Sequence, residues 1–130
     1  MNRHTAREKA MQILYQLDLT EASLPDVIEN FLELNERDPF LMSIVEGVTD
    51  HLAEIDHLIS QHLENWKIDR LGSVDKSILR MVTFEIQYRD DIHTSFSINE
   101  AIELAKTFSD EKSGNFVNGV LSNIMRAKER

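Results

Sequence analysis

Cysteine is absent from the 130 residues, and the chain has only four glycines and two prolines. The lack of thiols excludes disulfides, thiolate metal sites and cysteine nucleophiles, and it suits a reducing cytoplasm, where we expect the protein to act. So few turn-forming residues leave little material for β-hairpins, which favours an all-α fold. No apolar run approaches the roughly 20 residues that span a bilayer, and no signal-peptide segment follows the basic start. We therefore expect one helical domain over residues 1–130 and no membrane association.

Motifs of common catalytic sites are absent as well, because the sequence contains no HExxH, P-loop, GxSxG or GxGxxG pattern. Acidic residues fall on solvent-facing positions of the predicted helices, not in the apolar settings that tune catalytic carboxylates. His51, His57 and His62 are not spaced three or four residues apart, as two metal ligands on one helix would be. We expect no enzyme, no metal, no cofactor and no small-molecule substrate.

The whole chain has a net charge of −9, and positive charge is scarce in its first half. Residues 18–64 hold twelve acidic side chains against the single Arg37, whereas acidic and basic residues nearly balance elsewhere. This asymmetry can confine an anionic ligand to one face of the molecule. A solvated acidic surface that aids solubility is the alternative interpretation.

Apolar residues recur at helical spacing in six segments, which predicts about six helices. Thr5 with Glu8, and Ser97 with Glu100, have the spacing of capping boxes, so Arg3 and His4 would form a loose arm. Ser73 is the expected cap of another helix, and the longest helix would bend near Gly47. The expected helices and apolar stripes cover residues 3–19, 23–35, 38–66, 73–88, 97–108 and 117–124, with a polar turn at 109–114 and a frayed end at 126–130.

One side of the first predicted helix combines cations with an aromatic ring. His4, Arg7, Met11 and Tyr15 follow one another along that side, next to the apolar face. Cations that meet phosphates and rings that stack on bases are the means by which proteins bind single-stranded nucleic acid. The alternative is that Tyr15 lies at the edge of the core and the cations are merely solvated.

Five segments, in this order along the chain, resemble the NusB family of bacterial transcription antitermination factors. They are RHTARE at residues 3–8, QILY at 12–15, WKIDR and VDKSILR within 66–80, DIH with INEA within 91–101, and FVNGVL at 116–121. The resemblance implies two packed three-helix bundles, in total six to seven helices. It also implies a complex with NusE, a small-subunit ribosomal protein, and with the single-stranded boxA element of nascent RNA. That complex joins other Nus factors on the elongating RNA polymerase and suppresses termination, mainly on ribosomal RNA operons.

The resemblance also implies which residues bind. Arg3, His4 and Arg7 would contact RNA phosphates, and Tyr15 and Phe116 would offer ring surfaces to bases or partner. Phe116 lies about 70° from the centre of its apolar stripe, and the alternative is an edge-of-core role. The remaining implied contacts are Lys112 and Ser113 with RNA, and Tyr15, Asp69, Asp75 and Lys76 with NusE.

Two positions depart from the family pattern. His4 and Thr5 stand where the family often has arginine, which should weaken RNA binding or make it depend on pH. Lys112 stands where the family often has an acid, which should strengthen the attraction of phosphates. These two departures would partly offset each other.

Two other functions are compatible with such a sequence. One is a helical protein-binding module that forms homodimers through its apolar flanks and touches no RNA. The other is the NusB-like domain attached to RNA methyltransferases, which ranks low because 130 residues cannot also hold a methyltransferase with its cofactor-binding loop.

Overall fold

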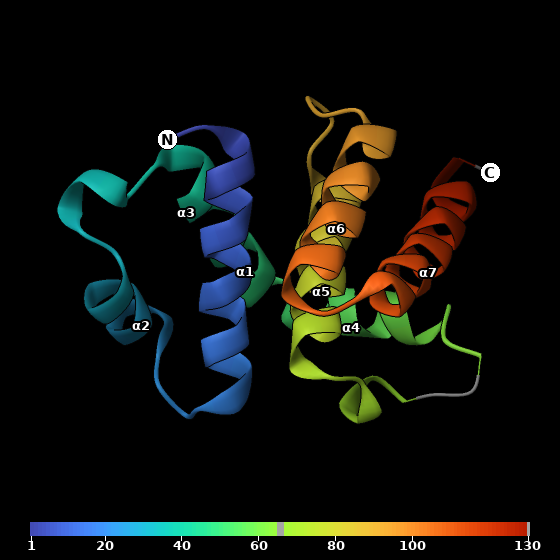
Figure 1. Ribbon diagram of the computed structural model, residues 1–130, viewed down its shortest axis with the longest axis horizontal. Helices are drawn as coiled ribbons and strands as arrows, with labels where there is room; N and C mark the ends of the chain where they lie inside the picture. Colours follow the sequence, from blue (N-terminus) through green and yellow to red (C-terminus); the bar gives the residue numbers. More distant parts are fainter. Residues whose placement is uncertain (65–66, 130) are drawn as a thin grey trace.

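The computed structural model describes residues 1–64 and 67–129 (Figure 1). This described part contains seven α-helices, two short 3-10 helices and no strand, so the all-α prediction is confirmed. The helices are α1 (Arg3–Leu19), α2 (Leu24–Phe31), η1 (Leu34–Glu36), α3 (Pro39–Asp50), α4 (Leu52–Ser60), η2 (Ile68–Arg70), α5 (Ser73–Tyr88), α6 (Thr94–Phe108) and α7 (Glu111–Glu129).

The buried helix α5 lies at the centre of the molecule and packs against α1, α3, α4, α6 and α7. The helices α1–α3 gather on one side of α5, and α6 and α7 lie against each other on the other side (Figure 1). The apolar stripes expected from the sequence meet in one continuous core. No helix in the described ranges is long and apolar enough to cross a bilayer.

The first helix begins at Arg3 as predicted, but the predicted capping box is wrong, because Asn2 is the N-cap. The Asn2 side chain accepts a hydrogen bond from the Thr5 amide at 2.8 Å, so no capping box forms between Thr5 and Glu8. Asparagine is as good a cap as threonine, and capping from residue 2 adds a turn to the helix. Arg3 and His4 therefore lie in the first turn of α1 and not on a loose arm.

The helix α6, expected over residues 97–108, begins earlier than predicted. His93 caps α6 by accepting from the Ser95 amide, so the helix starts at Thr94 and Ser97 lies inside it. Ser97 is buried and its hydroxyl donates to Glu85 of α5 at 3.0 Å. A polar side chain that finds a buried partner on a neighbouring helix has no need to act as a cap. Likewise Gly72 is the N-cap of α5, and Ser73 is its first residue.

The long helix expected over residues 38–66 is divided at His51 into α3 and α4, so the predicted bend at Gly47 is misplaced. Gly47 lies within α3, where an added Cβ atom would come 2.2 Å from the ring of Phe84. This glycine thus permits close packing of α3 on α5, not a bend. Trp66, the expected end of that helix, lies outside the described residues.

The second predicted helix, over residues 23–35, ends earlier, at Phe31. The last helix is longer than its apolar stripe. The Asp110 side chain accepts from the Ser113 amide at 2.8 Å, and Ser113 and Gly114 are helical, so the predicted turn is shorter than expected. At the other end, the Lys128 ammonium donates to the Ile86 carbonyl of α5. The expected fraying of residues 126–129 is therefore wrong, whereas Arg130 lies outside the described residues.

Candidate nucleic-acid interface

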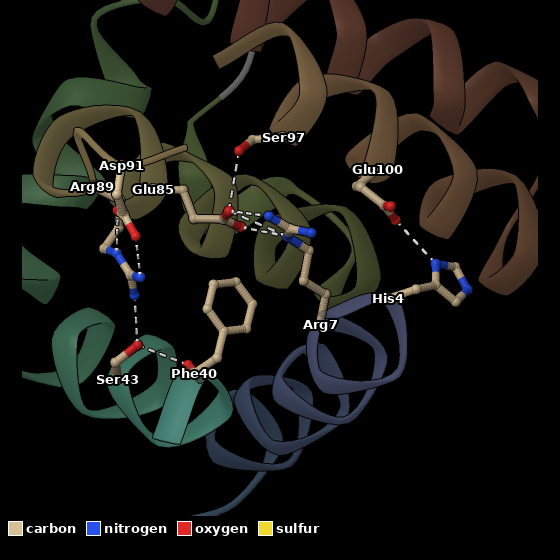
Figure 2. A network of polar contacts seen from close by, with 9 residues as sticks. All are labelled: His4, Arg7, Phe40, Ser43, Glu85, Arg89, Asp91, Ser97 and Glu100. Atoms are coloured by element: carbon tan, nitrogen blue, oxygen red, sulfur yellow. Dashed lines mark hydrogen bonds and ion pairs between the residues drawn. The ribbon is translucent and has the colours of Figure 1, made fainter. Parts of the chain in front are cut away.

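Arg7 is buried in an ion pair that joins α1 to α5 (Figure 2). Its Nη2 and Nε atoms donate to the Glu85 carboxylate at 2.6 and 3.0 Å, and both side chains are 0% exposed. Ser97 of α6 donates to the same carboxylate, so three helices meet at Glu85. The expectation that Arg7 contacts RNA phosphates is therefore not met in this structure, because its guanidinium is closed off from solvent.

Aromatic rings enclose the Arg7 guanidinium. Its central carbon lies 5.1 Å from the centre of the Phe40 ring and 5.5 Å from that of Phe96. The remaining nitrogen, Nη1, is buried without a hydrogen-bond partner, and the negative faces of these rings supply electrostatic compensation. Arg3 and Arg89 also lie over Phe40, at 4.6 and 5.2 Å, so this ring gathers three guanidinium groups. Of these, Arg3 is exposed and has no ion-pair partner among the residues described.

His4 lies on the surface between α1 and α6 (Figure 2). Its Nδ1 atom is 3.0 Å from Glu100 of α6, its Nε2 atom is 3.6 Å from Glu8, and its side chain is 53% exposed. The hydrogen bond with Glu100, together with the carboxylate charges around the ring, raises the pKa of His4 above its usual 6.5. The imidazole therefore carries a positive charge over more of the physiological pH range than a free histidine does.

A second cluster surrounds a hollow of about 280 Å³ where η2, α5 and α7 begin. The structure brings together here three side chains expected to bind RNA and one expected to bind NusE. The hollow is lined by Arg70, Leu71, Gly72, Asp75, Asp110, Lys112, Ser113 and Phe116. Phe116 is half-buried and Lys112 is exposed. Two cations, two carboxylates and an aromatic ring in one depression offer a nucleotide ionic, polar and stacking contacts together.

The Asp75 carboxylate of this hollow is shielded from water. Its Oδ1 atom is buried without a hydrogen bond, while Ser113 donates to Ser109 at 3.0 Å. Burial raises the pKa of Asp75 above its usual 3.8, and the charge of Asp110 adds to the rise. This carboxylate is therefore an acceptor whose ionised form the fold does not fully satisfy.

The other expected partner contacts lie apart from the hollow or point inward. Asp69 is exposed in η2, and Tyr15 is 37% exposed on α1. Met11, which the helical pattern placed beside Tyr15, is a buried core residue. The Lys76 ammonium is 3.2 Å from Asp18 of α1, and its side chain is largely buried, so Lys76 contributes an internal ion pair.

Glu85 and Phe96 are the two residues of this region that the sequence reasoning missed. Glu85 is one of two acids, with Asp75, on the segment 74–88, whose surface is apolar almost all round. A charge on a helix buried from all sides requires a buried partner of opposite sign, and Arg7 could have been suspected on that ground. Phe96, just before the predicted cap, is 51% exposed.

A sequence model of the NusB family matches residues 4–126. The chain is similar to the transcription antitermination protein NusB of Oceanobacillus iheyensis, with 59% identity over 125 residues that cover 96% of this chain and 99% of the relative. NusB of T. maritima aligns with a TM-score of 0.88 and 34% identity over 97% of this chain and 92% of that one. A complex of the antitermination factors NusB and NusE with double-stranded RNA aligns with a TM-score of 0.82 and 32% identity over 98% of this chain and 99% of that one.

Proposed function

The chain belongs to the NusB family, and we propose that it is a transcription antitermination factor that binds single-stranded boxA RNA together with NusE. In this role it joins other Nus factors on the elongating RNA polymerase in the cytoplasm and suppresses termination, mainly on ribosomal RNA operons. It acts by binding and not by catalysis. The proposal is supported by relatives named as antitermination proteins and by the similarity to a NusB–NusE complex that contains RNA.

The single observation that carries RNA binding is the placement of exposed cations beside the start of α6 and of a cation and an aromatic ring near its end. Arg3 and His4 lie beside the start of this helix, and the hollow with Lys112, Ser113 and Phe116 lies near its end. The 15 residues of α6 span about 22 Å. We assign a single strand that runs along α6 from one group to the other, and Tyr15 of α1 offers a further exposed ring. Such a path requires an unpaired strand, because stacking on the rings needs bases that are free of their complements.

Within this surface, cations and rings have separate tasks. Arg3, His4 and Lys112 contact phosphates, which gives affinity and salt dependence, whereas Phe116 and Tyr15 contact bases. Arg7 takes no phosphate and instead holds α1 on α5, so that Arg3 and His4 are correctly placed.

For NusE we propose a surface adjacent to the same hollow. Asp69 is exposed in η2, next to Arg70 of the lining, and Asp75 lines the hollow itself. Acidic side chains suit a basic ribosomal protein. Tyr15 contributes its exposed ring, and Lys76 supports the surface through its ion pair with Asp18. RNA and NusE would then lie side by side, which explains why one could strengthen the binding of the other.

The proposal is tested by fluorescence anisotropy of a labelled boxA RNA of about 12 nucleotides, with the protein alone and with NusE, at several salt concentrations. We expect tighter binding with NusE. Arg3→Ala should lower the slope of log K against log salt by about 0.7, the value for one phosphate on a single strand. The matched control is Arg37→Ala, because Arg37 pairs with Glu29 of α2 and lies outside the proposed surface.

Lys112→Asp, which restores the acid that the family often carries, should weaken RNA binding by about tenfold and also reduce the salt slope. An unchanged slope would remove Lys112 from the phosphate contacts. Sizing of the protein over a concentration series, with and without RNA and NusE, tests the alternative of a homodimeric module. A dimer that persists in the presence of both, with no RNA bound, would overturn the proposed function.

A further inference from the structure

Phe96 is a half-exposed ring in the first turns of α6, held from beneath by a buried cation. Its ring centre lies 5.5 Å from the Arg7 guanidinium carbon, and 51% of the residue remains exposed. The sequence neighbour Ser95 is exposed, as is Asn99, one helical turn further on. The exposed residues next to the ring on α6 are therefore polar.

Basic side chains from the first turns of α1 lie near Phe96. Arg7 also contacts Phe40, over which Arg3 lies at 4.6 Å. Glu100, one turn beyond Phe96 on α6, holds His4 at 3.0 Å. A strand whose phosphates meet Arg3 and His4 would pass its bases within reach of this ring.

We propose that Phe96 stacks on an unpaired base of the bound RNA, as a second ring platform at the opposite end of α6 from Phe116. This inference rests on the proposed RNA-binding function and adds a residue that it did not include. Stacking of a base on an aromatic side chain is tolerant of sequence, because every base has a π-face. A protein partner is the less suitable occupant, since the centre of a protein interface combines several apolar side chains, whereas the exposed neighbours of this ring on α6 are Ser95 and Asn99.

Arg7 prepares the ring for this contact. The buried Glu85 ion pair fixes the guanidinium, and the guanidinium fixes one side of the Phe96 ring. A ring that is already fixed loses little side-chain entropy when a base stacks on it. The ring also covers the Arg7 guanidinium, so Phe96→Ala would remove an aromatic face and expose this cation at the same time. The informative substitution therefore keeps an apolar cover and removes only the aromatic face.

The test compares Phe96→Leu, Phe96→Tyr and the wild type for binding of the labelled boxA RNA, in the presence of NusE. Phe96→Leu should weaken RNA binding by about tenfold and leave the salt slope unchanged, because a base contact and not a phosphate contact is lost. Phe96→Tyr should bind like the wild type. The matched control is Tyr88→Leu, since Tyr88 is 40% exposed but stacks on His51 and bonds to Glu54. Urea unfolding of each variant checks that the fold is kept.

A second measurement locates the base. The RNA is made with 2-aminopurine at one position after another, and its fluorescence is read in complexes with the wild type and with Phe96→Leu. Quenching at one position that is lost in Phe96→Leu and retained in Phe96→Tyr supports the proposal. Equal RNA affinity and equal quenching in all three proteins would overturn it, even if Arg3→Ala still weakened binding.

The remaining outcomes separate this inference from the function on which it rests. If the wild type binds RNA and Phe96→Leu binds it with the same affinity, the stacking role is refuted and the proposed function stands. Weaker capture of NusE by Phe96→Leu, with RNA affinity unchanged, would overturn the proposal in favour of a protein contact. If the wild type binds no RNA with or without folded NusE, the proposed function fails and the stacking role fails with it.

Discussion

Replacement of Arg7 by methionine tests the assignment of this residue to the fold and not to RNA. The substitution removes a guanidinium that donates to Glu85 at 2.6 and 3.0 Å from a site that is 0% exposed. Glu85 would keep only the Ser97 hydroxyl at 3.0 Å and would be left as a buried, nearly unpaired charge. Breaking a buried ion pair in this way costs about 3–5 kcal/mol. Domains of this size have a free energy of unfolding of about 5–15 kcal/mol, so Arg7→Met should lose a large part of it.

Urea unfolding followed by circular dichroism measures this loss. With an m-value of about 1.5 kcal/mol/M, a loss of about 4 kcal/mol lowers the midpoint by roughly 2.5 M. The double variant Arg7→Met with Glu85→Leu removes both charges and should recover most of the stability, because an apolar pair of similar volume often replaces a buried ion pair without cost. Recovery would be incomplete, since Ser97 loses its acceptor. A midpoint shift below about 0.5 M for Arg7→Met would refute the reasoning.

RNA binding by the stabilised double variant then separates the two roles of Arg7. A structural role predicts that the double variant binds boxA RNA with nearly the wild-type affinity and the same salt slope. A direct phosphate contact predicts weak binding with a slope reduced by about 0.7, although the fold has been restored. The second result would mean that Arg7 leaves its buried position when RNA binds.

Three further predictions concern single residues. The pKa of His4 should lie above 6.5 and should fall in Glu100→Gln, and NMR titration of His4 measures both values. The stabilisation from the pair of His4 with Glu100 is present at low pH and is lost as pH rises through the pKa of the folded state. RNA affinity should rise from pH 7.5 to 6 and become flat in His4→Ala. Asp75→Asn should raise the melting temperature more at pH 7 than at pH 4, because burial raises the pKa of Asp75 and the neutral side chain avoids the cost of the buried charge; equal effects at both pH values would contradict this. Gly47→Ala should destabilise by about 1–3 kcal/mol through overpacking against Phe84, and Phe84→Leu in the same chain should relieve the loss in urea unfolding.

Helical periodicity predicted which residues form the core, but it did not predict which residue caps every helix. Apolar stripes depend on spacing alone, and those of α1, α5, α6 and α7 are buried as expected. Helix starts depend on which of several competent caps is used, and Asn2 and His93 take the place of Thr5 and Ser97. The choice at Ser97 depends on Glu85, twelve residues earlier in the chain but adjacent in space. Local sequence cannot reveal a competition that a tertiary contact decides.

The same limit applies to the candidate site. Lys112, Ser113 and Phe116 are close in the sequence and line one hollow in the structure, although the sequence predicts a turn over residues 109–114 where α7 begins. Arg7 shares an equally regular spacing with His4, yet one side chain is buried and the other exposed. A helical wheel gives the direction in which a side chain points, but it does not tell whether another helix covers that side chain. Arg7 is covered and pairs with Glu85 of α5.

Two internal ion clusters hold α1 against α5 and so govern the proposed RNA surface. Near the start of α1, Arg7 binds Glu85; near its end, Asp18 accepts from Ser73 at 2.7 Å and pairs with Lys76 and Arg80. Because these contacts lie close to opposite ends of the helix, α1 is restrained from both sliding and turning on α5. Arg3, His4 and Tyr15 are carried by α1, whereas Phe96 and Phe116 are carried by α6 and α7, which pack on the same central helix. The surface that would meet RNA is thus fixed before the strand arrives, and binding energy need not be spent on arranging the helices.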